Sequence, residues 1–238
     1  MTGSPSIAVI IPTLNEAACI ESCLRETAVL SPDELVVADA GSSDETVALA
    51  RGHARVIEPF RDQPANSQPR GRGAQQNAGA RATHSEILVF LHADSRLEPK
   101  AICELRAWAK RCPAQPGGCF RMRVESRRQH YRLVGHSADF RAGLLNLPYG
   151  DQCLFARRSA FERVNGFPEI ALMDDLFFSR RLARLGRLAV LESAVHTSPR
   201  RWEKRGFVRQ TLLNWRLTAL VFAGVHPNQL APLYRPAR

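Results

Sequence analysis

Short apolar runs and amphipathic segments alternate along the first 110 residues of the chain. The runs are rich in β-branched and aliphatic residues, which is typical of strands buried on both faces. The strands that they predict are 6–11, 34–38, 55–57 and 86–91. The segments between and after them have helical spacing, so strand and helix alternate four times. This pattern predicts an α/β fold with a parallel central sheet covered by helices.

Turn and capping residues suggest where these elements begin and end. We expect Pro12 to end the first strand and Asn15 to cap the helix that follows it. Ser42 and Glu45 have the spacing of a capping box for the second helix, and Gly52 is a suitable end for it. Two further helices are predicted at 74–82 and 99–111.

The second half of the chain is less regular. Its predicted strands are 118–124, 153–156 and 187–191, and its predicted helices are 130–145, 159–164, 174–185 and 205–225. No composition shift marks a linker, so we expect a single domain. It divides into a first half at about 6–110, a second half at about 111–204, and a C-terminal helix and tail at 205–238.

Three polar residues stand where predicted strands end. Asn15 and Asp39 follow the first two strands, and Asp94 follows the apolar run at 86–91. Ligands of parallel α/β sheets bind beyond the carboxyl ends of the strands. The pattern alone therefore predicts that these side chains converge on one ligand-binding crevice.

Charge is distributed unevenly along the chain. Three arginines face nine acidic residues up to Phe60, whereas 30 basic residues face 14 acidic ones after it. A genome that favours arginine codons explains the excess of arginine as well as an anionic partner does. The arginines are scattered, aromatic residues are few, and no nucleic-acid-binding motif is present, so we expect no nucleic-acid partner.

The sequence shows no secretory signal and no apolar stretch of the roughly 20 residues that a membrane-spanning helix needs. Its six cysteines form no CxxC pair. We therefore expect a reduced, cytoplasmic protein.

Two strand-end carboxylates have a chemical and a structural interpretation. Asp94, two residues after His92, could hold a divalent cation against a diphosphate, or it could cap the following turn. Asp39, before Gly41, could accept hydrogen bonds from a ribose or a base, or it could belong to a turn.

Two groups of residues in the second half also have both a chemical and a structural interpretation. Asp174 and Asp175 repel each other, which suits a general base, but the helix dipole also favours acids at a helix N-terminus. Arg200, Arg201 and Trp202 suit a phosphate and a sugar or lipid face, or form a solvated basic loop.

Five segments together resemble the inverting family 2 glycosyltransferases. The segments are 10–16 (IIPTLNE), 37–44 (VADAGSSD), 70–80 (RGRGAQQNAGA), 90–94 (FLHAD) and 174–176 (DDL). Their order and spacing match, over roughly residues 6–190. Ser198–Trp202 and the closing Leu-Tyr-Arg are similar to a small bacterial subgroup of this family, named for radical-SAM or selenodomain association or for arsenosugar biosynthesis.

The resemblance implies a GT-A fold, with a Rossmann-like, mostly parallel sheet and helices on both faces. It implies a nucleotide-sugar donor, most often a UDP-sugar, bound by the first half, and an acceptor bound by the second. It implies Mg²⁺ or Mn²⁺ at Asp94 and a general base at Asp175, next to Asp174. The donor-binding residues that it implies are Pro12, Thr13, Glu16, Asp39, Arg72, Asn77, His92, Ala93, Arg201 and Trp202.

The sequence departs from the family pattern at two positions. His92 replaces the first carboxylate of the Asp-x-Asp metal motif, and Ala40 replaces the second acid of Asp-Asp-Gly-Ser. Two alternatives remain open: a degenerate homologue that binds a nucleotide without transferring sugar, and a nucleotidyltransferase on a related fold.

The apolar segment at 205–225 carries Arg205, Arg209 and Arg216 among its apolar residues. Such a helix can lie on the inner face of an anionic membrane, pack on the core, or pack on a second subunit as a homodimer. The sequence favours packing.

Overall fold

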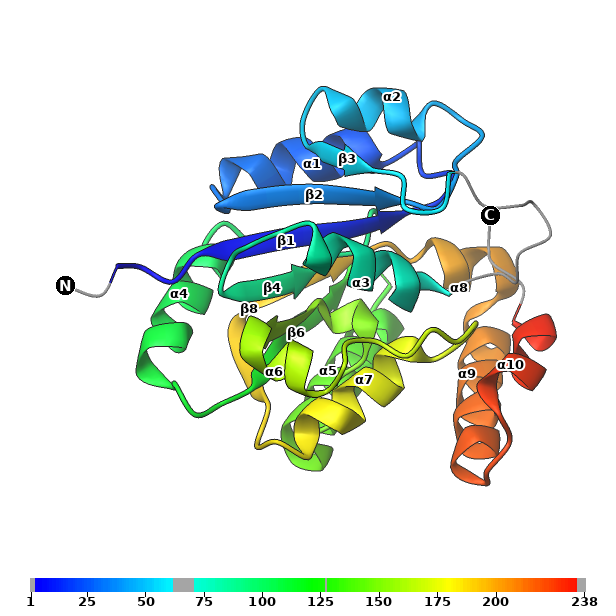
Figure 1. Cartoon of the computed structure of the whole chain (residues 1–238). Helices are drawn as coiled ribbons and strands as arrows, with labels where there is room; N and C mark the ends of the chain where they lie inside the picture. Colours follow the sequence, from blue (N-terminus) through cyan, green and yellow to red (C-terminus); the bar gives the residue numbers. More distant parts are fainter. Residues whose placement is uncertain (1–2, 62–70, 127, 235–238) are drawn as a thin grey trace.

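An eight-stranded sheet runs through the protein, in the order β3-β2-β1-β4-β7-β6-β8-β5 (Figure 1). The computed structural model describes residues 3–61, 71–126 and 128–234, with only the backbone of Arg201, Lys204 and Arg205. The strands are β1 Ile7–Thr13, β2 Glu34–Asp39, β3 Arg55–Ile57, β4 Ile87–Phe90, β5 Ser95–Leu97, β6 Gly117–Val124, β7 Leu154–Arg157 and β8 Ala189–Thr197. Neighbouring strands are parallel from β3 through β2 and β1 to β4, and β6 is parallel to β8. Strand β7 is antiparallel to both of its neighbours, β4 and β6, and β5 is antiparallel to β8.

Helices cover both faces of this sheet. They are α1 Ile20–Val29, α2 Thr46–Arg51, α3 Arg72–Arg81, α4 Ala101–Arg111, α5 His130–Leu145, α6 Arg158–Arg163, α7 Asp174–Ala183, α8 Arg200–Arg205, α9 Phe207–Phe222 and α10 Pro227–Leu230. Short 3₁₀ turns, η1 Gly150–Gln152 and η2 Ala231–Leu233, complete the described elements.

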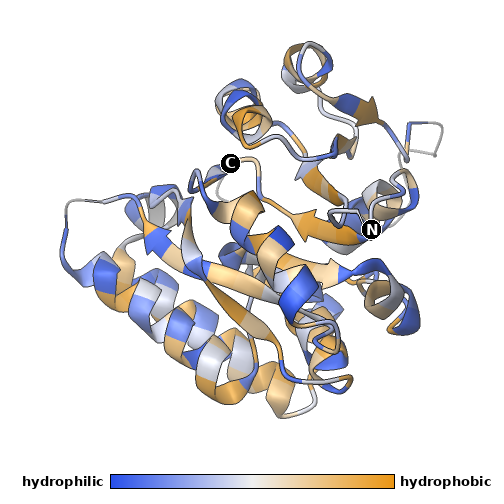
Figure 2. Cartoon of the chain, turned by 90° about the vertical axis from the view of Figure 1, so that its left-hand side faces the viewer, coloured by the Kyte–Doolittle hydropathy of each residue, from blue (hydrophilic) through white to orange (hydrophobic). Residues whose placement is uncertain are grey.

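Alternate residues of β1 belong to two different hydrophobic clusters. Ile7, Val9 and Ile11 pack with α1 and α4, whereas Ala8 and Ile10 pack with α3, α6 and α7. A strand sends successive side chains to opposite faces, so a run of five apolar residues fills both layers. Figure 2 shows the result, with hydrophobic strands surrounded by helices of mixed polarity.

Three predicted boundaries in the first half are wrong. β1 continues through Pro12 to Thr13, because the Thr13 carbonyl still accepts a hydrogen bond from Ala40. Asn15 does not cap a helix: its backbone is left-handed at φ 57° and α1 begins only at Ile20. Ser42 and Glu45 form no capping box; α2 begins at Thr46, whose N–H is accepted by Asp44.

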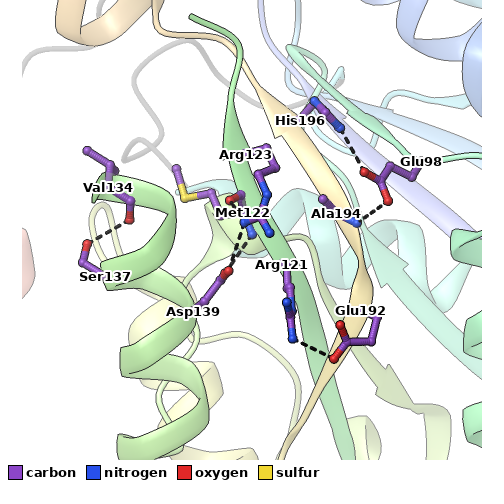
Figure 3. Close-up of polar contacts among 10 residues, drawn as sticks. All are labelled: Glu98, Arg121, Met122, Arg123, Val134, Ser137, Asp139, Glu192, Ala194 and His196. Atoms are coloured by element: carbon purple, nitrogen blue, oxygen red, sulfur yellow. Dashed lines mark hydrogen bonds and ion pairs between the residues drawn. The ribbon is translucent and has the colours of Figure 1, made fainter. Parts of the chain in front are cut away.

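Strand β8 extends six residues past its predicted end. Glu192 and Ser193 interrupt the apolar pattern because they form a bulge against β6. Glu104 of α4 accepts hydrogen bonds from both of their N–H groups, and Glu98 accepts one from Ala194. Figure 3 shows the neighbouring contacts, including Asp139 of α5 against the Met122 N–H group at 2.9 Å. Carboxylates from outside β8 thus accept the hydrogen bonds of the N–H groups in the bulge, and the local sequence of β8 does not reveal these partners.

The helix predicted at 205–225 is α9, which spans Phe207–Phe222. Gly206 adopts φ 83° and separates α9 from the short helix α8 that precedes it. Leu217 and Val221 of α9 pack against Leu176 of α7 and Leu230 of α10.

None of the helices in the described part of the chain combines the length and the apolar character of a membrane-spanning segment.

Candidate functional site

The carboxylate of Asp39 organises the ends of β1 and β2. Asp39 is fully buried, and one of its oxygens accepts hydrogen bonds from the N–H groups of Gly41 and Ser42 at 2.8 and 2.7 Å. The other accepts from the hydroxyls of Thr13 at 2.8 Å and Ser42 at 2.5 Å. Because both oxygens accept hydrogen bonds within the protein, Asp39 fixes the shape of the loop that follows β2.

A second set of contacts joins the loop after β1 to the loop after β2. Asn15 donates its N–H to the Ser42 hydroxyl, and its side-chain oxygen accepts from the Ser43 N–H at 2.9 Å. The Glu16 N–H is accepted by the Thr46 hydroxyl at 2.8 Å. The two loops therefore form one surface at the carboxyl edge of the sheet, as the position of Asn15 and Asp39 in the sequence predicts.

Gln75 braces this edge from α3. Its side-chain nitrogen donates to the carbonyls of Thr13 and Ala38 at 2.7 and 2.9 Å. Sequence reasoning placed Gln75 in a motif but gave it no role. A long polar residue within a helix of small residues is the signal that could have identified it. Pro12, also buried, lies in the strand end that Gln75 holds.

His92 and Arg72 meet beyond the end of β4. Nη1 of Arg72, in the first turn of α3, lies 3.2 Å from Nε2 of His92. Ala93 is buried beside them, while Asp94 is exposed and accepts a hydrogen bond from the Ser95 hydroxyl at 3.3 Å. An arginine and an exposed carboxylate therefore share the edge of the sheet with the β1 and β2 loops.

Glu16 connects electrostatically to the same region. Burial raises the pKa of its carboxyl; a hydrogen bond from Cys19 opposes this, the negative charge of Asp94 adds to it, and Arg200 and Arg72 oppose it. Charged groups of α3, α8 and the loop after β4 therefore lie close enough to Glu16, in the loop after β1, to affect its pKa. Burial also raises the pKa of the Cys19 thiol to about 12, so Cys19 is no nucleophile at neutral pH.

Asp174 and Asp175 open α7 with different surroundings. Oδ2 of Asp175 accepts the N–H of Gly150 at 2.7 Å. Burial and then the charge of Asp175 raise the pKa of the Asp174 carboxyl to about 7, against a lowering by Arg72. The Asp174 carboxyl therefore exchanges its proton near neutral pH. Two adjacent carboxyls of which one can stay protonated suit a site in which the other acts as a general base.

Gly150 places Asp175 beside His92. A Cβ on Gly150 would lie 3.0 Å from Oδ2 of Asp175 and 3.3 Å from Nε2 of His92. The carboxylate and the His92–Arg72 pair therefore border the same small space. Sequence reasoning missed Gly150; the Gly-Asp-Gln run before a predicted strand is a weak signal, since close approach depends on the tertiary fold.

Two other predicted site residues, Asn77 and Trp202, contact other parts of the protein. Asn77 is buried, and its amide both donates to the Phe167 carbonyl and accepts the Phe167 N–H, each at 2.9 Å. Trp202 packs edge-on against Tyr131, with ring centroids 6.0 Å apart. Arg201 lies in α8, but its side chain is outside the described residues.

The residues at this edge fit a divalent cation only if a ligand supplies most of its oxygens. No group of three or more His, Cys, Asp or Glu side chains in the described part of the chain could hold a metal ion. His92 turns its Nε2 to a guanidinium, which leaves Asp94 as an exposed, hard oxygen ligand. One carboxylate suits a cation shared with a diphosphate.

Comparison with known sequences identifies relatives of this chain. The sequence model described as glycosyl transferase family 2 matches residues 8–164. The O-antigen chain rhamnosyltransferase RfbN of Salmonella typhimurium is 27% identical over 197 residues, which cover 76% of this chain and 62% of RfbN. The chain thus spans less than two thirds of that relative.

Solved structures with the same fold contain nucleotide sugars. S. aureus TarS in complex with UDP-GlcNAc has a TM-score of 0.66 at 18% identity, over 81% of this chain and 58% of TarS. The mannosyltransferase PcManGT of Pyrobaculum calidifontis, in complex with GDP-Man and Mn²⁺, has a TM-score of 0.64 at 23% identity, over 97% of this chain and 68% of PcManGT. The GT-A fold predicted from the motifs is confirmed.

Proposed function

Because this chain belongs to glycosyl transferase family 2, we propose that it transfers a sugar from a nucleoside-diphosphate donor to a nucleophile on an acceptor, with inversion at the anomeric carbon. The observation that supports this proposal is the position of Gly150, where a Cβ would lie 3.0 Å from Oδ2 of Asp175 and 3.3 Å from Nε2 of His92, which itself contacts Arg72. A base on one side and a phosphate-binding cation on the other are what an in-line displacement needs.

The nucleoside end of the donor is assigned to the joined loops after β1 and β2. Thr13, Glu16 and Asp39 lie there, and Gln75 and Asp39 keep the strand ends rigid. A preformed loop loses little freedom when it binds a ligand, which favours affinity. UDP and GDP donors both occur in proteins of this fold, so the choice of base is left to measurement.

The diphosphate end is assigned to Arg72 and Asp94. Arg72 is exposed at the first turn of α3 and offers charge-assisted hydrogen bonds to phosphate oxygens. His92 accepts from one of its guanidinium nitrogens and so holds the arginine in place. Asp94 would hold a Mg²⁺ or Mn²⁺ ion together with the diphosphate, and such an ion would stabilise the negative charge of the leaving group.

Asp175 is assigned as the general base. In the proposed step its carboxylate takes the proton from an acceptor hydroxyl, whose oxygen forms a bond to the anomeric carbon. The bond from that carbon to the phosphate oxygen breaks, and the nucleoside diphosphate leaves with the electron pair. Asp174 supports this step because its raised pKa keeps it partly protonated near pH 7, which limits the repulsion between the two carboxyls.

The donor site can be tested by thermal-shift titration with UDP, GDP and CDP, with and without Mn²⁺ or Mg²⁺. We expect one nucleotide to raise the melting temperature, more strongly with metal. Asp94→Asn should abolish the additional effect of metal but keep the effect of nucleotide alone. Metal alone should give no shift in the wild type. No shift with any nucleotide would contradict the donor site.

Turnover is tested by the release of nucleoside diphosphate from the nucleotide sugar that binds. Asp175→Asn should keep donor affinity and lose turnover, while Glu162→Gln, an exposed carboxylate on α6, serves as the matched control. Donor binding by the wild type without release of nucleoside diphosphate, in the presence of acceptor mixtures, would favour the alternative of a nucleotide-binding homologue without transferase activity.

The anomeric configuration of the product, determined by NMR, tests inversion. The acceptor and the arsenosugar or selenodomain subgroup stay predictions.

A further inference from the structure

The outer face of α9 is apolar and faces solvent. Val208, Leu212, Trp215 and Phe222 repeat at helical spacing and are each between 53% and 70% exposed. The opposite face packs on α7 and α10 through Leu217 and Val221. The sequence favoured packing for this segment, and the structure shows packing on one face only. Contiguous exposed apolar side chains of this kind mark a surface that binds a partner or a membrane.

Basic side chains of α9 border this stripe, and α9 itself carries no Asp or Glu. Arg209 and Arg216 are exposed on one flank, adjacent to Leu212 and Trp215. From residue 204 to the end, the sequence has six basic residues and no Asp or Glu, Glu203 being the last acid. The face is therefore amphipathic and cationic.

A groove runs between α9 and the segment after α10. Its volume is about 650 Å³. Its lining combines two guanidinium groups with apolar side chains: Arg209, Gln210, Leu212, Leu213, Arg216, Pro232 and Leu233. A phosphate with an attached hydrocarbon chain satisfies both parts of such a lining, since the arginines pair with the phosphate and the leucines cover the chain.

We propose that the outer face of α9, with this groove, docks the protein onto an anionic lipid surface. Tryptophan and leucine on one face of a helix with arginines beside them are the composition that binds in the interface of a bilayer. A second copy of the chain fits less well, because two such faces in contact would bring arginines together without a carboxylate on either α9 to pair with them. The proposal stands apart from the transferase reaction and does not depend on it.

Flotation of the full chain with vesicles tests this proposal. We expect binding to vesicles of phosphatidylcholine with phosphatidylglycerol, weak binding to phosphatidylcholine alone, and release by high salt. Arg209→Gln with Arg216→Gln should lower the partition coefficient by about tenfold or more, since each basic side chain near an anionic surface contributes roughly a fivefold factor. Arg81→Gln with Arg163→Gln, two exposed arginines on α3 and α6, is the matched control.

The apolar contribution is tested at the same surface. Leu212→Ser with Trp215→Ser should abolish flotation, whereas Leu133→Ser with Leu144→Ser, exposed leucines on α5, should not. Brominated lipids should quench wild-type tryptophan fluorescence, and Trp215→Phe should bind equally but lose most of the quenching. Circular dichroism checks that each variant is folded.

Three results would overturn the proposal. The first is no flotation of the wild type with anionic vesicles, and the second is equal binding by the α9 variants and their controls. The third is a lipid-free dimer that Leu212→Ser with Trp215→Ser dissociates, with no vesicle binding by the wild type.

Discussion

Nη1 of Arg72 lies 3.2 Å from Nε2 of His92, and this contact defines what the histidine can do. A guanidinium has no acceptor, so Nε2 must accept and the ring proton must reside on Nδ1. A neutral ring held in this way has no free lone pair on Nε2 for a metal. His92, at the position of the first carboxylate of the family's metal motif, therefore positions an arginine.

Arg72→Gln should weaken nucleoside-diphosphate binding by about tenfold or more, because a hydrogen bond to a charged group contributes roughly 1.5–3 kcal/mol. Isothermal titration calorimetry with the preferred diphosphate measures the loss, and the nucleoside without phosphates should bind both proteins equally. Arg81→Gln, at the last turn of the same helix, controls for charge. Equal diphosphate affinities for Arg72→Gln and the wild type would remove Arg72 from the site.

Sequence reasoning located the edge of the sheet that carries this site. Asn15, Asp39 and Asp94 follow predicted strands, so their convergence depends only on a parallel sheet. The sequence does not reveal the partners of these polar side chains: Asn15 contacts the loop after β2, and Asn77 contacts the distant Phe167. A polar residue in a motif can bind a ligand or bind the protein's own backbone, and the two cases have the same local sequence.

Asn77→Ala separates these two cases. The substitution would leave the N–H and carbonyl of Phe167 buried without partners, at a cost of roughly 2–4 kcal/mol in the free energy of unfolding. Urea denaturation measures this loss, and nucleotide affinity of the folded protein should stay unchanged. A large loss of nucleotide affinity in a variant of normal stability would make Asn77 a donor ligand.

The pKa of Asp174 gives stability a defined pH dependence. Burial, and then repulsion by Asp175, raise the pKa from 3.8 to about 7, so the folded protein prefers the protonated carboxyl. That stabilisation is complete below pH 3.8 and is lost as the pH rises through about 7. Asp174→Asn cannot ionise and avoids the loss.

We therefore expect Asp174→Asn to be more stable than the wild type at pH 8 by roughly 4 kcal/mol, and the difference to shrink toward pH 5. Urea denaturation at both pH values measures it. Glu162→Gln, exposed on α6, should show no such pH-dependent difference. A stability difference for Asp174→Asn that does not change between pH 5 and pH 8 would show that Asp174 is not held protonated.

Gly150 shows what a sequence cannot reveal about a site. Its role comes from the approach of η1 to the start of α7, which brings residues 150 and 175 together across the second half of the fold. A Cβ at this position would meet the Asp175 Cβ at 3.2 Å and Oδ2 at 3.0 Å, both closer than ordinary contacts. A side chain at this position would therefore press on Asp175, whose carboxylate would have to shift by a few tenths of an ångström.

Gly150→Ala should shift the Asp175 carboxylate by a few tenths of an ångström and lower turnover by about tenfold, since a displacement of 1 Å in a reacting group can cost about a hundredfold in rate. Donor affinity should fall less than turnover does, and not to zero, because the added Cβ would also lie 3.3 Å from Nε2 of His92, which holds Arg72. Release of nucleoside diphosphate measures turnover, and calorimetry measures affinity. Gly143→Ala, where a Cβ would meet nothing within 4 Å, is the matched control on α5. If Gly150→Ala and Asp175→Asn both reduce turnover, the double variant should be little worse than Asp175→Asn alone, because both act on one group. Additive losses would mean that Gly150 acts on something other than the base.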